Sequence, residues 1–181
     1  MTTLIQEKAF LQAGTLDLEQ YLLSNELFWP LMGDMQRLSP GSLLLGLKRA
    51  KALAEAPADQ AALEQFTAKF NAVRSHWAVA WEEKAAREYG MRFKLWAEYV
   101  NDYRLDPGRN AGIYINEVRQ RTMLALLAQD LPRHLPEMDA LAELDSIIRA
   151  QVVTGECIWG AVFEPVFPRD AFWFLYRSLH K

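Results

Sequence analysis

The stretch LEQFTAKFNAVRSHWAVAWEEKAAREYGMRFKLWAEYVNDY, residues 63–103, carries the pattern that decides the fold. Its first half repeats apolar or small residues at alternating steps of three and four, at Leu63, Phe66, Phe70, Val73, Trp77 and Ala80. This spacing keeps the side chains on one face of an α-helix, as in the heptad seams of packed helices. We therefore expect a helix that begins near Pro57 and buries this face.

A second seam begins where the first one fails. Continuing the first seam reaches Lys84 and Arg87, whereas apolar residues resume at Tyr89, Phe93, Trp96, Val100 and Tyr103. The offset between the seams rotates the buried face, and Gly90 lies at the join. Two helices that meet at Gly90 would explain this offset. We favour one helix of about 45 residues that bends near Gly90 and ends before the turn at residues 106–108.

Shorter helices are predicted on both sides of this segment. Thr3 and Gln6 have the spacing of a capping box, and Gly14 can end the first helix in a left-handed conformation. Residues 156–167 lack a helical period, and Gly160 and Pro165 favour an ordered loop there over a hairpin. We expect helices over residues 3–14, 15–24, 40–55, 111–130 and 136–152, and a deeply packed final helix over 171–180. The fold class predicted is all-α: a single domain, residues 1–181, with six or seven helices around the long central one.

Composition excludes several classes of protein. Hydrophobic residues make up 51% and charged residues 24% of the 181 residues, which is typical of a folded domain and not of a disordered chain. The net charge of −3 gives no support for nucleic-acid binding, which needs a basic surface. We find no signal peptide and no apolar run of the roughly 18 residues that a membrane span requires. Because Cys157 is alone, no intrachain disulfide is expected, and we predict a soluble, cytoplasmic protein without nucleic-acid or membrane partners.

No catalytic, cofactor or metal motif is apparent. The sequence lacks a glycine-rich phosphate loop, a nucleophile elbow and an H-E-x-x-H pair. None of the three histidines follows a glutamate by three residues, as a di-iron bundle would require. Glu156 would disfavour a thiolate at the neighbouring Cys157, so we expect a packed thiol there. We predict no catalytic residue, no cofactor and no metal; whether the protein is an enzyme stays open, with non-enzymatic activity favoured.

The richest cluster of recognition residues surrounds the corner at LWAEYVNDYRLDPGRN, residues 95–110. Tyr89, Trp96 and Tyr103 are seven residues apart and so share one helix face, and arginines flank them on both sides of the turn. Tyrosine and arginine are enriched at protein interfaces, and arginine also clamps carboxylates and phosphates. Aromatic stripes at helical spacing usually pack in a core, and that interpretation is favoured over an interface or a small-ligand pocket. The candidate interface or ligand contacts, named the elbow residues here, are Tyr89, Arg92, Trp96, Tyr99, Tyr103, Arg104, Arg109, Tyr114 and Arg119.

Two functions from different classes follow. The first is a non-enzymatic module for protein–protein interaction or scaffolding, with a protein partner or a second copy of the chain bound through a seam or the elbow. The alternative is a small-molecule binding protein or an enzyme, with an aromatic pocket between helices lined by Trp77, Trp81, Trp96 and Tyr99. An enclosed cavity would favour the second hypothesis, and a packed centre would favour the first.

Overall fold

The computed structural model describes residues 2–150 and 152–179. The prediction of an all-α fold is confirmed, since seven α-helices account for most of these residues. The helices are α1 (Leu4–Leu23), α2 (Pro40–Leu53), α3 (Pro57–His76), α4 (Ala78–Leu105), α5 (Pro107–Asn110), α6 (Tyr114–Asp130) and α7 (Pro136–Ala150). Shorter elements are the 3-10 helices η1 (Ala111–Ile113), η2 (Ala161–Phe163) and η3 (Trp173–Tyr176) and the strands β1 (Val152–Thr154) and β2 (Arg177–Leu179).

Backbone contacts divide the chain into two compact units, Met1–Glu88 and Tyr89–Lys181. The boundary falls inside α4, where the first sequence seam gives way to the second. The grouping of all 181 residues into one domain stays a prediction.

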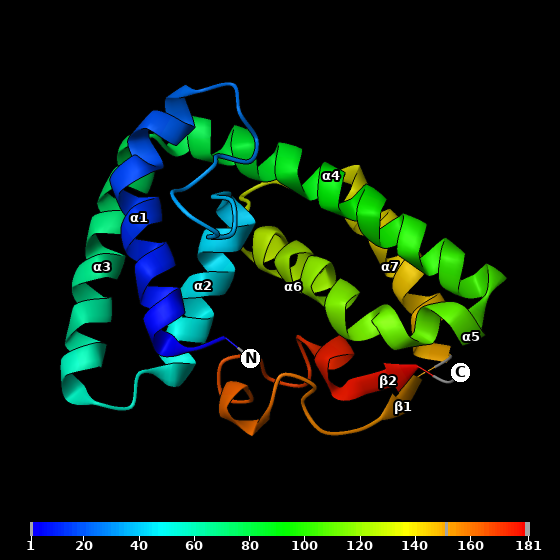
Figure 1. Cartoon of the computed structure of the whole chain (residues 1–181). Coiled ribbons are helices and arrows are strands. Elements are labelled where there is room, and N and C mark those ends of the chain that lie inside the picture. Colours follow the sequence, from blue (N-terminus) through cyan, green and yellow to red (C-terminus); the bar gives the residue numbers. More distant parts are fainter. Residues whose placement is uncertain (1, 151, 180–181) are drawn as a thin grey trace. The chain divides into compact units, whose positions relative to one another are not determined.

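The first unit is built on α1, α2 and α3, which lie side by side (Figure 1). Its core holds the buried faces of these helices, with Trp81 of α4 packed edge to face on Phe70 of α3 at a centroid distance of 5.3 Å. The first predicted seam is confirmed, because its six residues are buried in this core or packed against it. The seam therefore serves the fold of its own chain.

Local capping fixes where α1 and α2 begin, and the capping box predicted at Thr3 and Gln6 is confirmed. Thr3 Oγ accepts a hydrogen bond from the Gln6 N–H, and the Gln6 side chain accepts one from the Thr3 N–H. Ser39 and Ser42 make the same reciprocal pair at the start of α2. These side chains satisfy N–H groups that a helix start leaves without partners.

The predicted helix end at Gly14 is wrong, since α1 continues through Gly14 to Leu23. Gly14 is buried, and a Cβ there would lie 3.1 Å from methyl groups of both Leu38 and Leu43. The glycine therefore permits close packing and does not end the helix. Local sequence cannot separate these two uses of glycine.

The prediction of one helix of about 45 residues is wrong, because the helix breaks at Trp77 (φ −109°, ψ 37°). The predicted continuity through Gly90 is confirmed, since α4 runs unbroken from Ala78 to Leu105. The Trp77 N–H still bonds to the Val73 carbonyl, and the Trp77 carbonyl accepts from the Trp81 N–H. The break brings Trp81 back onto Phe70, so core packing accounts for its position.

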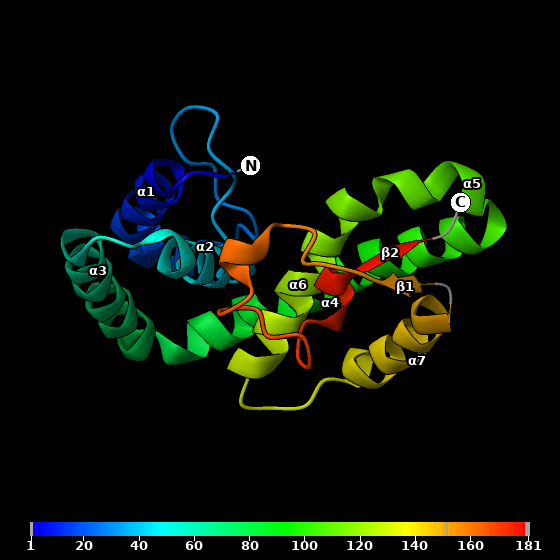
Figure 2. The ribbon, with the colours of Figure 1, turned by 90° about the horizontal axis from the view of Figure 1, so that it is seen from below.

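In the second unit, α4 contributes residues from Tyr89 onward, and α6 and α7 supply further buried faces. Four of the five residues of the second predicted seam, Tyr89, Trp96, Val100 and Tyr103, are buried, and the fifth, Phe93, is partly exposed. Strands β1 and β2 lie side by side (Figure 2). They form an antiparallel pair in which Val152 is opposite Leu179 and Thr154 is opposite Arg177.

The C-terminal segment departs from the predicted helix over 171–180. Residues 173–176 form η3 and residues 177–179 form β2, while residues 180 and 181 lie outside the described part. The expected deep packing is confirmed, since Phe172 and its four successors are buried. The backbone finds partners in β1, so a helix is not needed to satisfy it. The loop predicted over 156–167 is present, with η2 inside it.

Candidate functional site

The inner face of α1 is part of the core of the first unit. Phe10, Leu11, Leu18 and Tyr21 are each at most 3% exposed. The Tyr21 hydroxyl donates a hydrogen bond to the Leu27 carbonyl at 3.0 Å, which ties the loop after α1 to the helix. This inner face determines which side of α1 is left for solvent.

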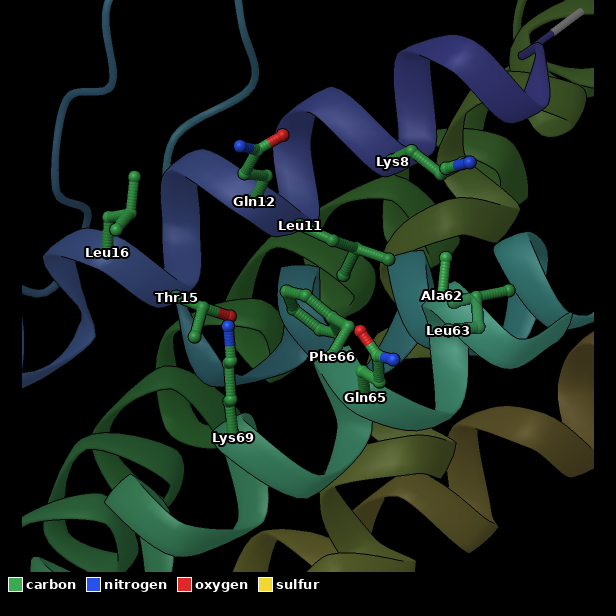
Figure 3. A pocket seen from close by; sticks show the side chains of 10 residues that line it. All are labelled: Lys8, Leu11, Gln12, Thr15, Leu16, Ala62, Leu63, Gln65, Phe66 and Lys69. Carbon is green, nitrogen blue, oxygen red and sulfur yellow. The ribbon is translucent and has the colours of Figure 1, made fainter. Parts of the chain in front are cut away.

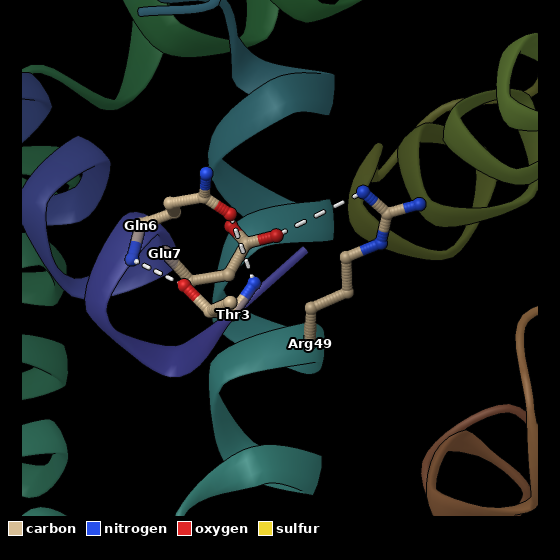
Figure 4. Close-up of polar contacts among 4 residues, drawn as sticks. All are labelled: Thr3, Gln6, Glu7 and Arg49. Atoms are coloured by element: carbon tan, nitrogen blue, oxygen red, sulfur yellow. Dashed lines mark hydrogen bonds and ion pairs between the residues drawn. The ribbon is translucent and has the colours of Figure 1, made fainter. Parts of the chain in front are cut away.

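Polar contacts reinforce the orientation of α1 near its start (Figure 4). Glu7 is only 3% exposed, and its Oε1 lies 3.8 Å from Nη1 of Arg49 on α2. The side chain of Glu7 also lies against Gly46, where a Cβ would be 3.2 Å from Oε2. With Gly14 packed on Leu38 and Leu43, α1 is held against α2 at two points along its length.

The outer face of α1 carries a seam that no described residue covers. Its positions follow steps of four and three: Ile5, Ala9, Gln12, Leu16, Glu19 and Leu23. All six are exposed, and the large apolar side chains are 80%, 78% and 60% exposed at Ile5, Leu16 and Leu23. We call this set the outer seam. A helix with apolar residues on both faces is usually buried on both, so this face is a candidate contact surface.

A groove between α1 and α3 lies beside the outer seam (Figure 3). It has a volume of about 410 Å³ and an apolar floor that includes Leu11, Leu63 and Phe66. Lys8 and Lys69 lie towards opposite ends of the groove, and Lys8 Nζ is 2.9 Å from the Asp59 carboxylate. Gln12 and Leu16 belong to both the outer seam and the groove wall, so the seam and the groove form one continuous surface.

A second groove, of about 720 Å³, separates α2 from α3. Lys48 and Lys51 line one wall. Burial, together with repulsion from Lys51, lowers the pKa of Lys48. Leu47, Ala54 and Leu63 line this groove as well, and none of the outer seam residues does.

Six of the nine elbow residues are buried in the second unit: Tyr89, Arg92, Trp96, Tyr99, Tyr103 and Tyr114 are at most 7% exposed. The rings of Trp96, Tyr99 and Tyr114 pack on one another with centroids 5.4–6.4 Å apart. The structure therefore brings most of the predicted cluster together, as core. Of the remaining three, Arg104 and Arg109 are exposed and Arg119 is partly exposed.

Polar atoms of this cluster are satisfied unevenly. The Tyr114 hydroxyl donates to the Phe174 carbonyl at 2.8 Å, and the Tyr99 hydroxyl donates to the Asn110 carbonyl at 3.3 Å. The Tyr89 hydroxyl and the Trp96 indole N–H are buried and have no hydrogen-bond partner in the part of the chain that the structure describes. Burial raises the pKa of Tyr99 and Tyr114 and raises the pKa of Tyr89 to about 12.

A buried ion pair lies next to these rings, and the sequence did not point to it. Arg121 of α6 donates to Asp145 of α7 through Nε at 2.9 Å and Nη2 at 2.6 Å. The guanidinium also lies over the ring of Phe174, 4.5 Å from its centroid. Both charged residues are at most 8% exposed, so the pair joins α6 to α7 inside the core.

The four residues of the predicted aromatic pocket do not line either groove described above. Trp77 packs against the first core, and Trp81 is 1% exposed with Arg74 over its ring. Trp96 and Tyr99 pack in the second unit. In this structure all four rings contribute to packing.

Other candidate chemistry is limited in the described residues. Cys157 is buried, and burial raises the pKa of its thiol. Within residues 2–150 and 152–179, no three His, Cys, Asp or Glu side chains gather where they could hold a metal ion. No helix in those ranges combines the length and apolar character that crossing a bilayer requires.

The outer seam was missed because the sequence was divided at Gly14. Once α1 runs unbroken from Leu4 to Leu23, Ile5, Leu16 and Leu23 fall on one line. The available signal was a heptad spacing opposite the core face, and reading residues 4–23 as one helix would have revealed it.

Comparison of the chain with models of protein families, with curated proteins and with solved structures finds no match.

Proposed function

We propose that this protein is a non-enzymatic protein–protein interaction module that binds through the outer seam of α1. The observation that carries the proposal is the exposure of Ile5, Leu16 and Leu23 at heptad spacing along one helix face. Burying one such side chain in a partner contributes about 1.5–3 kcal/mol before the costs of association. The surface is suited to a helix, because a seam of this spacing packs against another helix.

The α1–α3 groove supports the same proposal. Its floor is apolar, and it opens next to Gln12 and Leu16, so a side chain of the bound helix can enter it. Lys8 and Lys69 at its edges favour a partner that presents carboxylates there. An apolar centre with charged edges resembles the usual composition of a specific interface.

The elbow remains the competing surface. Its aromatic residues are buried, but Leu105, Ile113 and Ile115, which flank Arg109 in the sequence, are 85%, 42% and 52% exposed. These three residues lie on three different elements, α4, η1 and α6, and so do not form a seam along one helix. We therefore place the contact on α1 and use the elbow as the matched control.

Site-specific photo-crosslinking tests the choice. A photoreactive amino acid is placed at Leu16 in the full chain, and in a second protein at Ile115, which is also an exposed apolar residue on a helix. We expect a discrete crosslinked product in cells from position 16 and none from position 115. Products from position 115 alone would move the contact to the elbow, and products from neither position would overturn the proposal.

A further inference from the structure

The outer seam is compatible with a two-fold contact, because its alternating steps of four and three read the same from either end. Its six positions pair about Gly14, with Ile5 and Leu23 at equal distances on either side, then Ala9 and Glu19, then Gln12 and Leu16. A two-fold axis through the middle of α1 therefore maps each seam position onto another seam position. Isologous dimers require such a self-complementary surface.

We infer that the partner is a second copy of this chain, with the two α1 helices antiparallel and crossing near Gly14. This inference rests on the proposed function. Ile5 of one copy then meets Leu23 of the other at both ends of the contact, and Leu16 meets Gln12 near the centre. Antiparallel helices pack in layers of this mixed kind.

The charges on α1 favour the antiparallel direction. In that arrangement Glu19 meets Ala9 of the second copy, next to Lys8, whose Nζ also lies 2.9 Å from the Asp59 carboxylate of its own chain. In a parallel pair Glu19 would face Glu19, and like charges in a desolvated seam are unfavourable. Charge complementarity therefore adds to the symmetry of the seam positions.

The strength of association follows from the composition of the seam. Two Ile–Leu layers and two Leu–Gln layers exclude water, while the Ala–Glu layers contribute little apolar area. We expect a reversible dimer in the micromolar range, because the gain only moderately exceeds the cost of association. Light scattering should give a mass that rises with concentration towards twice that of one chain.

Single substitutions separate the seam from other exposed apolar residues. Leu16→Glu changes a side chain that is 78% exposed, so the fold should be unaffected. The Kd of the dimer should rise at least tenfold. Ile115→Glu is the matched control, since Ile115 is 52% exposed on α6. The control should dimerise as the unmodified chain does. Equal loss in both variants, or in neither, would overturn the inference.

Disulfide trapping determines the direction. Residues 5 and 23 are about 27 Å apart along one helix, so cysteines at these positions cannot join within a chain. The Ile5→Cys/Leu23→Cys protein should form a covalent dimer on mild oxidation, and each single variant should form far less. Efficient dimerisation of Ile5→Cys alone would show a parallel pair and overturn the antiparallel arrangement.

The two proposals fail in different ways. A purified chain that stays monomeric at all concentrations, but crosslinks in cells from position 16 to a different protein, would overturn self-association and leave the interaction module standing. A monomer with no crosslink from position 16 would remove both. A crosslink from position 16 to a second copy supports both.

Discussion

The Glu88 carboxylate accepts a hydrogen bond from the backbone N–H of Gly41 at 2.7 Å, across 47 residues of sequence. Its other oxygen accepts from the Ser39 hydroxyl at 2.7 Å. Glu88 is fully buried on α4, and Gly41 lies in the first turn of α2. A carboxylate in this position satisfies a free N–H group and interacts favourably with the positive end of the helix dipole.

Gly41→Ala should destabilise the protein. A Cβ at this position would lie 2.7 Å from Glu88 Oε1, closer than a carbon and an oxygen can approach. Either the hydrogen bond or the packing around Glu88 must give way, at a cost of about 1–3 kcal/mol. Urea unfolding followed by circular dichroism measures the loss.

The matched control is Gly112→Ala. A Cβ there meets nothing within 4 Å, so the free energy of unfolding should change by less than about 0.5 kcal/mol. Glu88→Gln keeps the shape but removes the charge, and it should cost about 1–3 kcal/mol as well. Equal stability of the two alanine variants would contradict the role of the Glu88 contact.

The Arg121–Asp145 pair gives a second prediction. Asp145→Leu leaves the Arg121 guanidinium buried without its carboxylate partner. Arg121→Met leaves the Asp145 carboxylate buried without its guanidinium partner. Each single substitution should lower the free energy of unfolding by about 3–5 kcal/mol, because the remaining charge is desolvated and uncompensated. Urea unfolding of both variants measures this.

The double variant provides the control for that prediction. With both charges gone, the uncompensated charge disappears, so the double variant should be more stable than either single variant. Additive losses in the two substitutions would mean that the pair acts through packing alone.

Tyr89 and Tyr114 offer a comparison of two buried hydroxyl groups. The Tyr114 hydroxyl bonds to the Phe174 carbonyl, whereas the Tyr89 hydroxyl has no partner among the described residues. Tyr114→Phe should therefore cost about 0.5–1.5 kcal/mol, and Tyr89→Phe should be neutral or stabilising. A loss on Tyr89→Phe that matched the loss on Tyr114→Phe would indicate a bonded hydroxyl at both positions.

Tyr89→Phe should also change how the stability of the protein depends on alkaline pH. Burial first, and then the negative charges of Asp145 and Glu137, raise the pKa of Tyr89 to about 12, against the opposing effect of Arg121. An unfolded tyrosine releases its proton near pH 10, so above that pH the unfolded state gains relative to the folded one. Stability should fall between about pH 10 and about pH 12, and less steeply in Tyr89→Phe. Unfolding free energies measured at several alkaline pH values check the slope.

Local and periodic features of the fold were predictable from sequence. The capping pairs at Thr3 and Ser39 lie within one helical turn, and the seams of residues 63–80 and 89–103 repeat at helical spacing. Such signals need no knowledge of distant residues. The elbow was likewise recognised as a cluster, but residue type and spacing cannot distinguish a core stripe from an exposed one.

Packing between distant segments decided the helix boundaries and the buried contacts that the sequence did not predict. The turn at Trp77 depends on where Trp81 meets Phe70, and the continuation of α1 through Gly14 depends on the approach of Leu38 and Leu43. The Arg121–Asp145 pair joins residues on two helices that the sequence cannot orient.

The sequence by itself determined the helical class, the starts of the first helix and of α2, and the faces that seek burial, because these follow from capping and from the 3.6-residue period of the helix. Only the tertiary structure decided which faces find a partner within the chain. Leu11 and Leu16 lie on the same helix, yet one is 1% and the other 78% exposed. That difference arises because α2 and α3 can cover one side of α1 and leave the other side to solvent.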